Sequence, residues 1–332
     1  MDPQLAGTRP PDRRPVCYAA EPSSSREPLA MKRSVVAISM VLAGLAAAQE
    51  RDWAKVEVKV VPVAGGVSML VGEGGNIGVT TGKDGIFIID DQFEPLLPKI
   101  RAALKTLGDG PVRFVVNTHF HGDHTGSNAR LREAGAVIIA QENVRKRLGM
   151  ERLDRETKKM IPPKPPEAWP LVTYESGVKL YLNGDELEVT HVARAHTDGD
   201  SIIRFRKANV VHMGDNFFNG GYPFIDVDSG GSIDGMIAAV DQVLATSDDK
   251  TKLIPGHGPL GSKAELQTYR NMLADARDRV KALIAQGKTL DQIVAAKPTA
   301  QWDAKWGKAF MDPDMFVSFV HRSLTEKPAG TK

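Results

Sequence analysis

Apolar and polar residues alternate in short runs along the first part of the chain, beginning near residue 56. The runs at residues 56–61, 68–71, 76–79 and 85–89 predict four strands, because side chains two positions apart face the same side of a sheet. Glycine-rich turns separate these runs, and such short turns connect antiparallel neighbours. The pattern therefore predicts an antiparallel meander.

The rest of the chain alternates strands with helices. Helical patterns occur at residues 93–107, 126–134 and 141–149, and begin again at residues 232, 262 and 289. Further strands are predicted at residues 112–117, 136–140, 178–182, 185–192, 201–206, 209–213 and 252–254. The helices after 262 and 289 each begin with a capping-box sequence. Two successive strand-then-helix halves predict an α/β fold in which two β-sheets pack face to face with helices outside.

A proline-rich segment at residues 150–171 interrupts this alternation. It contains Trp169 and five prolines, which disfavour regular structure: Pro162, Pro163, Pro165, Pro166 and Pro170. A long excursion of this kind inside a domain is often functional. It is interpreted either as a loop that covers the substrate or as a stiff surface connector.

The N-terminal region has the pattern of a secretory signal peptide. Residues 31–33 are basic at two positions, residues 34–45 are mostly apolar, and three alanines at 46–48 offer a cleavage site before Gln49. The apolar stretch is shorter than the roughly 20 residues of a membrane span, although an uncleaved anchor is the alternative. We therefore expect residues 31–48 to be a signal peptide that exports the protein, in a bacterium to the periplasm.

A signal peptide functions at the very N-terminus, so translation is expected to start at Met31. Residues 1–30, which are rich in proline and lack periodic apolar positions, are interpreted as a disordered upstream extension. Residues 49–332 then form one domain of a size typical for a single large domain. No stable membrane insertion is expected after cleavage.

The charge of the mature region argues against a nucleic-acid partner. Residues 49–332 contain 37 Lys and Arg residues and 37 Asp and Glu residues, so their formal charge is zero. Cys17 is the only cysteine and precedes the signal peptide. Any metal site in the mature protein must therefore use nitrogen and oxygen ligands. The expected partner is a small-molecule substrate, and the oligomeric state stays open.

Three histidines and one aspartate fall within the sequence His119-Phe120-His121-Gly122-Asp123-His124, directly after the apolar run 112–117. On an extended segment, residues two apart point the same way, so His119 and His121 can share one metal ion. Gly122 allows a sharp turn, after which Asp123 and His124 can face a second ion. Imidazole and carboxylate are ordinary zinc ligands.

Three further residues suit the same site, since each follows a strand-like segment. They are His196, Asp215 and His257. Together with the first four they make a complete dinuclear ligand set. Of the remaining histidines, His212 and His191 are interpreted as core or supporting residues, and His321 as a surface residue.

This order of ligands resembles the metallo-β-lactamase-fold superfamily of hydrolases over roughly residues 56–280. The resemblance implies a four-layer αββα sandwich of two mixed sheets, with the metals at one edge between them. It also implies one ion on His119, His121 and His196, and another on Asp123, His124 and His257. An aspartate at Asp90 or Asp91 is implied to support the metal loop.

Asp215 matches the aspartate that bridges the two ions in glyoxalase II-like members of the superfamily. True β-lactamases usually carry cysteine or serine at this position, which argues against a dedicated β-lactamase role. The expected cofactor is two zinc ions, although a sulfur-free ligand set also permits manganese or iron. Two ions sharing a water lower its pKa toward neutrality, which favours hydrolysis of a carbonyl.

The leading functional prediction is an exported dinuclear zinc hydrolase that acts on a cyclic amide, ester or lactone, with β-lactamase-like activity among the options. Asp123 is expected to ligate metal and to accept a hydrogen bond from the attacking hydroxide. Asn219 and Tyr222 are candidate donors to a developing oxyanion. The neighbouring Phe217, Phe218 and Phe224 are predicted either to line the pocket or to lie in the core.

Three alternatives stay open. A glyoxalase II-like thioester hydrolase is disfavoured because residues 214–249 contain no Lys or Arg to hold glutathione. An iron-dependent oxidoreductase is the alternative from another enzyme class, although a full seven-ligand set fits hydrolysis better. The third alternative is a non-catalytic metal-binding accessory protein.

Overall fold

The computed structural model describes residues 51–153 and 159–326. The predicted signal peptide and the upstream extension lie outside these residues. The short segment 154–158 inside the proline-rich region also lies outside them.

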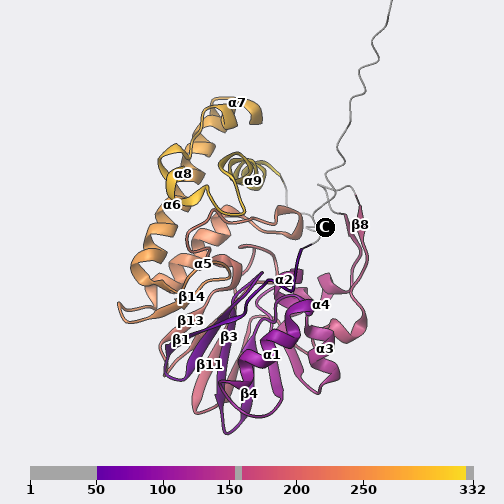
Figure 1. Cartoon of the computed structure of the whole chain (residues 1–332). Helices are drawn as coiled ribbons and strands as arrows, with labels where there is room; N and C mark the ends of the chain where they lie inside the picture. Colours follow the sequence, from indigo (N-terminus) through magenta and orange to yellow (C-terminus); the bar gives the residue numbers. More distant parts are fainter. Residues whose placement is uncertain (1–50, 154–158, 327–332) are drawn as a thin grey trace, which may run out of the picture. The chain divides into compact units, whose positions relative to one another are not determined.

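The first sheet has seven strands and contains the predicted meander (Figure 1). Its order is β1 (Lys59–Ala64), β2 (Val67–Val71), β3 (Ile77–Gly82), β4 (Gly85–Ile89), β5 (Val112–Val116), β6 (Val137–Gln141) and β9 (Val172–Tyr174). Strands β1 to β4 pair antiparallel, which confirms the meander, whereas β4, β5, β6 and β9 run parallel. The carboxyl ends of β4, β5 and β6 therefore meet at one edge of the sheet.

The second sheet has six strands and brings a second set of strand ends to one edge. Its order is β10 (Gly177–Leu182), β11 (Asp185–His191), β12 (Ser201–Phe205), β13 (Val210–His212), β14 (Lys252–Ile254) and β15 (Gly261–Ser262). Strands β13 and β14 are parallel neighbours, and the other pairs are antiparallel. The loops after β11, β13 and β14 consequently leave the sheet on the same side.

Helices cover the outer face of each sheet. The first sheet carries α1 (Leu97–Lys105), which follows the 3₁₀ turn η1 (Glu94–Leu96), and α3 (Asn128–Glu133); the short α2 (Gly122–Thr125) and α4 (Glu142–Leu148) flank its edge. The second sheet carries α5 (Ile233–Ala245), α6 (Lys263–Ala285), α7 (Leu290–Ala295), α8 (Ala300–Trp306) and α9 (Pro313–Thr325). The capping boxes of α6 and α7 are both formed as predicted.

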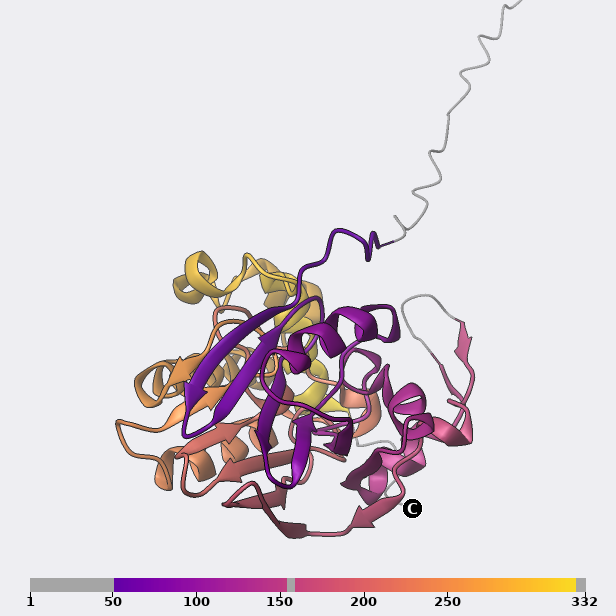
Figure 2. The same cartoon turned by 60° about the horizontal axis from the view of Figure 1, so that its bottom comes forward.

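Alternate residues of strand β4 pack into two different hydrophobic cores, one on each face of the first sheet. Ile86 and Ile88 pack toward α1, whereas Phe87 and Ile89 pack against the second sheet, as the two-residue period of a strand requires. A third core lies between the second sheet and helices α5, α6 and α9. Three apolar cores separate four layers, so the predicted αββα sandwich is confirmed (Figure 2).

The proline-rich segment is partly regular. Its first half forms two-residue strands, β7 (Arg152–Leu153) and β8 (Met160–Ile161), that pair antiparallel. Its second half is a connector: after η2 (Pro166–Ala168), the Trp169 indole donates to Lys164 O at 2.9 Å. The Arg145 guanidinium lies 5.3 Å from the Trp169 ring centroid, close enough for a cation to be attracted to the ring face.

Hydrogen bonds between the two halves join the sheets at the edge where the loops meet. The Asn76 side chain donates to Pro255 O and Gly258 O, both at 2.9 Å, and the Asn76 amide donates to Gly256 O at 2.7 Å. His212, predicted as a supporting residue, is buried and contacts Asn76 O through Nε2 at 3.1 Å. Among residues 51–153 and 159–326, no helix combines the length and apolar character needed to cross a bilayer.

Candidate metal centre

Three histidine side chains converge on one point at the shared edge of the two sheets. His119 and His121 follow β5, and His196 lies in the loop between β11 and β12. The His121 Nδ1 atom is 3.1 Å from His119 Nε2 and 3.0 Å from His196 Nε2. Ligands about 2.0–2.1 Å from a tetrahedral zinc ion are separated by about 3.3 Å, so this cluster has nearly the spacing of a metal triad.

The second predicted cluster forms beside the first. His124 and Asp123 lie in α2, and His257 follows β14. The Asp123 Oδ2 atom is 3.5 Å from His124 Nε2 and 3.3 Å from His257 Nε2. These three residues can therefore ligate one ion together.

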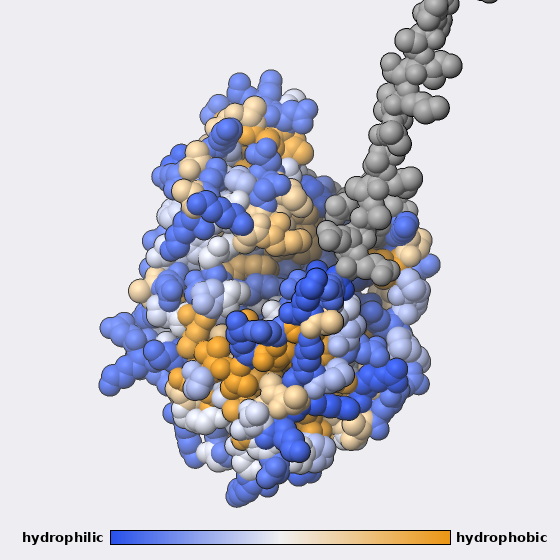
Figure 3. All heavy atoms as spheres, viewed as in Figure 1, coloured by the Kyte–Doolittle hydropathy of each residue, from blue (hydrophilic) through white to orange (hydrophobic). Residues whose placement is uncertain are grey.

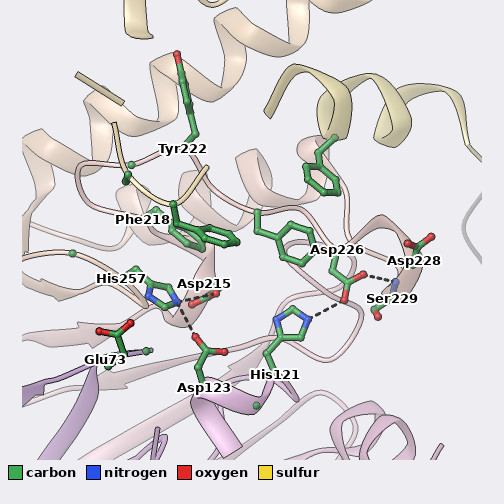
Figure 4. Close-up of a pocket in the computed structure, with 18 of the residues that line it drawn as sticks. Glu73, His121, Asp123, Asp215, Phe218, Tyr222, Asp226, Asp228, Ser229 and His257 are labelled. Atoms are coloured by element: carbon green, nitrogen blue, oxygen red, sulfur yellow. Dashed lines mark hydrogen bonds and ion pairs between the residues drawn. The ribbon is translucent and has the colours of Figure 1, made fainter. Parts of the chain in front are cut away.

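Asp215 lies between the two clusters (Figure 4). Its Oδ2 atom is 3.8 Å from His119 Nε2, 3.5 Å from His196 Nε2 and 3.4 Å from His257 Nε2. Its Oδ1 atom is 3.1 Å from His124 Nε2. The single carboxylate thus reaches both clusters, as a bridging ligand must.

Two buried atoms of the cluster support the fit of a cation. Within the described part of the chain, His124 Nε2 and Asp215 Oδ1 are buried and make no hydrogen bond of acceptable geometry. Unpaired buried polar atoms are costly, and an ion ligated by both would satisfy them. The structure brings all seven predicted ligands together, in one group of four and one of three.

Asp90 orients ligands of both clusters from behind. Its carboxylate accepts hydrogen bonds from the Thr118 amide and hydroxyl, each at 2.7 Å, and contacts His124 Nδ1 at 2.8 Å. The Thr118 hydroxyl in turn lies 3.0 Å from His119 Nδ1. These contacts turn His124 Nε2 and His119 Nε2 toward the site, which confirms the supporting role expected for an aspartate here.

Sequence reasoning missed Asp226, which holds His121 in the same way. Its Oδ2 atom is 2.9 Å from His121 Nε2, and its Oδ1 atom accepts the Ser229 amide at 2.9 Å (Figure 4). The loop from Phe217 to Asp226 also provides Phe224 O, 2.9 Å from His196 Nδ1. Each ring of the first triad thus has its outer nitrogen occupied and its inner nitrogen directed at the site.

The electrostatic environment gives the residues of the two clusters different protonation states. Burial lowers the pKa of His119 well below its usual range and lowers that of His196 to about 4, so both rings are neutral at pH 7. Burial alone would raise the pKa of Asp215, but the nearby His257 and His124 outweigh it and hold the carboxyl ionised. Asp215 and Asp123 in turn raise the pKa of His257 to about 9, against the effect of burial.

Two glycines allow the backbone to approach the ligands closely. A Cβ atom added to Gly75 would overlap the His124 ring, and one added to Gly256 would overlap the Asp215 carboxylate. Glycine is therefore required at both positions if the ligands are to keep their places.

The ligands lie at one side of a cavity of about 1090 Å³. The cavity exposes His121, Asp123, Asp215 and His257, whereas His119, His124 and His196 are almost completely buried behind them. The paired strands β7 and β8 contribute Leu153 and Ile161 to the lining, and a substrate-covering role for this half of the segment stays a prediction. A small molecule can therefore reach the metal ligands from solvent.

The two predicted oxyanion donors differ in their positions. The Asn219 side chain lines the cavity and donates to Pro259 O at 3.0 Å, which leaves its second amide hydrogen for a substrate. The Tyr222 hydroxyl instead donates to Asp303 at 2.7 Å, and Figure 4 shows the side chain directed away from His257 and Asp123. The Tyr222 ring also stacks 4.4 Å from Phe316 of α9, so its position lends no support to the predicted oxyanion role. The role of Asn219 stays a prediction.

The phenylalanines of the same loop divide between core and cavity. Phe217 is completely buried against Tyr269 of α6, so it belongs to the core. Phe218 and Phe224 line the cavity. The predicted pocket-lining role thus holds for two of the three.

Comparison with known families decides the evolutionary relationship. The sequence profile of the metallo-β-lactamase superfamily matches residues 67–257, which include all seven ligands. The chain belongs to the metallo-β-lactamase superfamily. Solved structures with a similar fold include β-lactamases and a sulfatase, which are hydrolases.

Solved structures show the shared superfamily fold. A metallo-β-lactamase from Pontibacter korlensis has 18% sequence identity and a TM-score of 0.51, and the match covers 66% of this chain and 100% of that one. For the DIM-1 metallo-β-lactamase the values are 19%, 0.52, 67% and 100%. The sec-alkylsulfatase Pisa1 from Pseudomonas sp. has 17% identity and a TM-score of 0.61, over 80% of this chain and 50% of its own length. No curated protein sequence matched the chain.

Asp226→Asn should weaken metal binding at the first triad. The substitution keeps the side-chain volume but removes the charge that orients His121, and loss of such a partner typically costs about 10–100-fold in metal affinity or activity. The measurement is chelator competition on the metal-loaded protein. Asp228→Asn, two residues along the same loop, serves as the control and should retain its metal; equal retention by both variants would contradict the role of Asp226.

Proposed function

We propose that the protein is an exported hydrolase that holds two zinc ions and hydrolyses the carbonyl group of a cyclic amide, ester or lactone, with β-lactams among the candidate substrates. The observation that carries the proposal is the placement of Asp215 between two ligand clusters that open into one cavity. One ion would be held by His119, His121 and His196, and the other by Asp123, His124 and His257.

When bound, the two ions would activate water at neutral pH and polarise the substrate carbonyl. The residues of the chain then orient the reactants. Asp123 is ionised, because its histidine neighbours lower its pKa despite its burial, and its side chain faces the cavity. It can accept a hydrogen bond from the attacking water while Asn219 donates to the carbonyl oxygen from the opposite loop. His257 Nε2 lies 3.3 Å from Asp123 Oδ2 and holds that carboxylate in position.

All ligand atoms are nitrogen or oxygen, which suits zinc and also admits manganese or iron. Zinc is preferred because five of the seven ligands are imidazoles, and because the site would have three protein ligands for each ion besides the shared carboxylate. This arrangement leaves coordination positions that substrate can reach through the cavity.

The charged residues that line the cavity argue against the glutathione thioester alternative. Arginines line it from segments outside 214–249, but three of them are paired with carboxylates: Arg51 with Glu73, Arg147 with Asp198, and Arg322 with Asp228. Paired cations attract an anionic glutathione group less strongly than free ones. This arrangement favours a less charged substrate over a glutathione thioester.

The test is metal analysis of the reconstituted mature protein together with a substrate panel. We expect close to two ions per chain, with hydrolysis of β-lactams, lactones or esters that is lost on metal removal and restored by zinc. The panel includes a glutathione thioester and a secondary alkyl sulfate, since the sulfatase match spans more of the chain than either β-lactamase match.

Three results would contradict the proposal. Full activity with one ion per chain would exclude the dinuclear site. Turnover of only the thioester or the sulfate would replace the proposed substrate class, and oxygen consumption with an iron-loaded protein would favour the oxidoreductase alternative.

Export rests on the residue pattern before Gln49 and predicts cleavage near Ala48. N-terminal sequencing of the protein from its native host should begin close to Gln49, and the protein should be recovered in the periplasmic fraction. Mature protein that retains residues 1–30 would exclude this part of the proposal.

A further inference from the structure

Aromatic side chains border both ligand clusters on the cavity side. The Phe218 ring stacks on His257 with a centroid separation of 5.0 Å and an interplanar angle of 19°. The Phe224 ring lies 5.9 Å from His121 and 5.8 Å from His196. A substrate bound at the metal ligands would therefore contact the apolar surface formed by these two phenylalanine rings.

Helix α9 extends this surface away from the ligands. Its Phe319 contacts Phe224 edge to face, with centroids 4.9 Å apart. The helix is fixed against the second half of the domain by the Arg322–Asp228 ion pair at 2.8 Å and by the bond from the Ile233 amide to the Ser323 hydroxyl at 2.9 Å. Helix α9 lies outside the part of the chain that matches the superfamily, which ends at residue 257.

The outer end of the cavity is also apolar. Exposure of its large apolar side chains to water is unfavourable. Phe310, in the loop before α9, is 79% exposed, which is the highest value for a large apolar side chain in the described residues. Leu153 of the β7–β8 hairpin is 52% exposed, and both residues line the cavity. Exposed apolar side chains gathered around a recess commonly mark a binding site. Figure 3 shows apolar residues at a recess between the C-terminal helices and the N-terminal half.

We propose that Phe224, Phe319 and Phe310 form a subsite for an uncharged alkyl or aryl arm of the substrate, with the scissile group at the metal ligands. The cavity is larger than the hydrolysed bond alone requires, and its volume slightly exceeds the usual range for small-molecule sites. Its aromatic walls would remove such an arm from water, while the paired arginines offer little attraction to an anionic one. This subsite deepens the proposed hydrolase function and rests on it for the nature of the scissile group.

The test uses a binding measurement that does not need turnover. Sodium acetate, butyrate, hexanoate and octanoate are titrated calorimetrically into the metal-loaded mature protein, and the hydrolysis of 4-nitrophenyl esters with the same chains is measured in parallel. Burial of each methylene should tighten binding by about fourfold until the chain leaves the subsite. The ratio of octanoate affinity to acetate affinity is the readout.

Phe310→Ala and Phe319→Ala should each lower this ratio severalfold. Phe310 is exposed, so its replacement leaves the fold intact even if Phe319→Ala destabilises α9. Tyr181→Ala, at a 69% exposed aromatic residue on β10 outside the cavity lining, is the matched control and should keep the wild-type ratio.

The outcomes separate the subsite from the hydrolase proposal. A wild-type protein without chain-length dependence, or a Phe310→Ala variant with the wild-type ratio, would overturn the subsite even if esters are hydrolysed. Chain-length-dependent binding that Phe310→Ala reduces would support the subsite even if none of the esters is turned over.

Discussion

Asp215→Ala should lose both hydrolytic activity and bound metal. The carboxylate contacts ligands of both clusters, so its removal leaves His124 Nε2 without its 3.1 Å neighbour and takes away the negative charge that lies between the triads. We expect a fall in rate of at least about 100-fold, since even residues that merely orient a ligand cost about 10–100-fold. Turnover rate and metal content are measured on the same preparation.

The Asp215→Cys variant tests whether the residue at position 215 determines substrate preference independently of metal binding. Thiolate binds zinc strongly, so we expect this variant to keep one or both ions while its preference among amide, ester and thioester substrates shifts. Because residues 49–332 contain no natural cysteine, thiolate ligation in a protein of these residues can be followed after cobalt substitution by sulfur-to-metal charge-transfer absorption. Wild-type rates with an unchanged substrate preference would show that the bridging position does not determine specificity.

Asp90→Asn should have the next largest effect, because one carboxylate supports both clusters. The two Asp90 oxygens now contact the Thr118 amide, the Thr118 hydroxyl and His124 Nδ1. An asparagine side chain has only one oxygen, and its NH₂ group would face donors in place of the second oxygen. We expect metal affinity to fall by about 10–100-fold, most strongly for the ion on His124. Chelator titration with metal analysis of the retained fraction measures this.

The backbone at Asp90 determines which substitution is informative. Its φ is 64°, a left-handed conformation that asparagine tolerates and alanine adopts only with strain. Asp90→Asn therefore tests the charge, whereas Asp90→Ala would also disturb the chain. Asp84→Asn, just before the opposite end of β4, is a suitable control because Asp84 bonds only to the turn at Asn183 among the contacts described for its carboxylate. Equal metal retention in the two asparagine variants would rule out the proposed support.

The sequence predicted the sandwich and the metal ligands because both have short-range signals. Alternation in β4 and helical spacing in α5 reflect burial on defined faces, and these faces are visible in the sequence without knowledge of the partner. The ligands were recognisable because histidines and aspartates followed apolar runs. Boundaries moved by a few residues, as where η1 precedes α1 around two prolines.

Contacts that depend on long-range folding were not predictable in the same way. Asp226 meets His121 only because the loop after Asp215 returns to the sheet edge, and nothing in its local sequence distinguishes it from a turn carboxylate. The orientation of Tyr222 was not predictable for the same reason, because its stacking partner Phe316 comes from α9, far along the chain. Strands β7 and β8 contain two residues each and are too short to show alternation.

The origin of the ligands along the chain has a consequence for folding. His119 to His124 come from the first sheet, whereas His196, Asp215 and His257 come from the second, so each ion would act as a cross-link between the two halves. Metal that binds only the folded chain stabilises it by an amount that grows with the free-metal concentration, about 4 kcal/mol at 1,000 times the dissociation constant. The lifetime of this protein against proteolysis should then report the zinc supply of the compartment in which it resides.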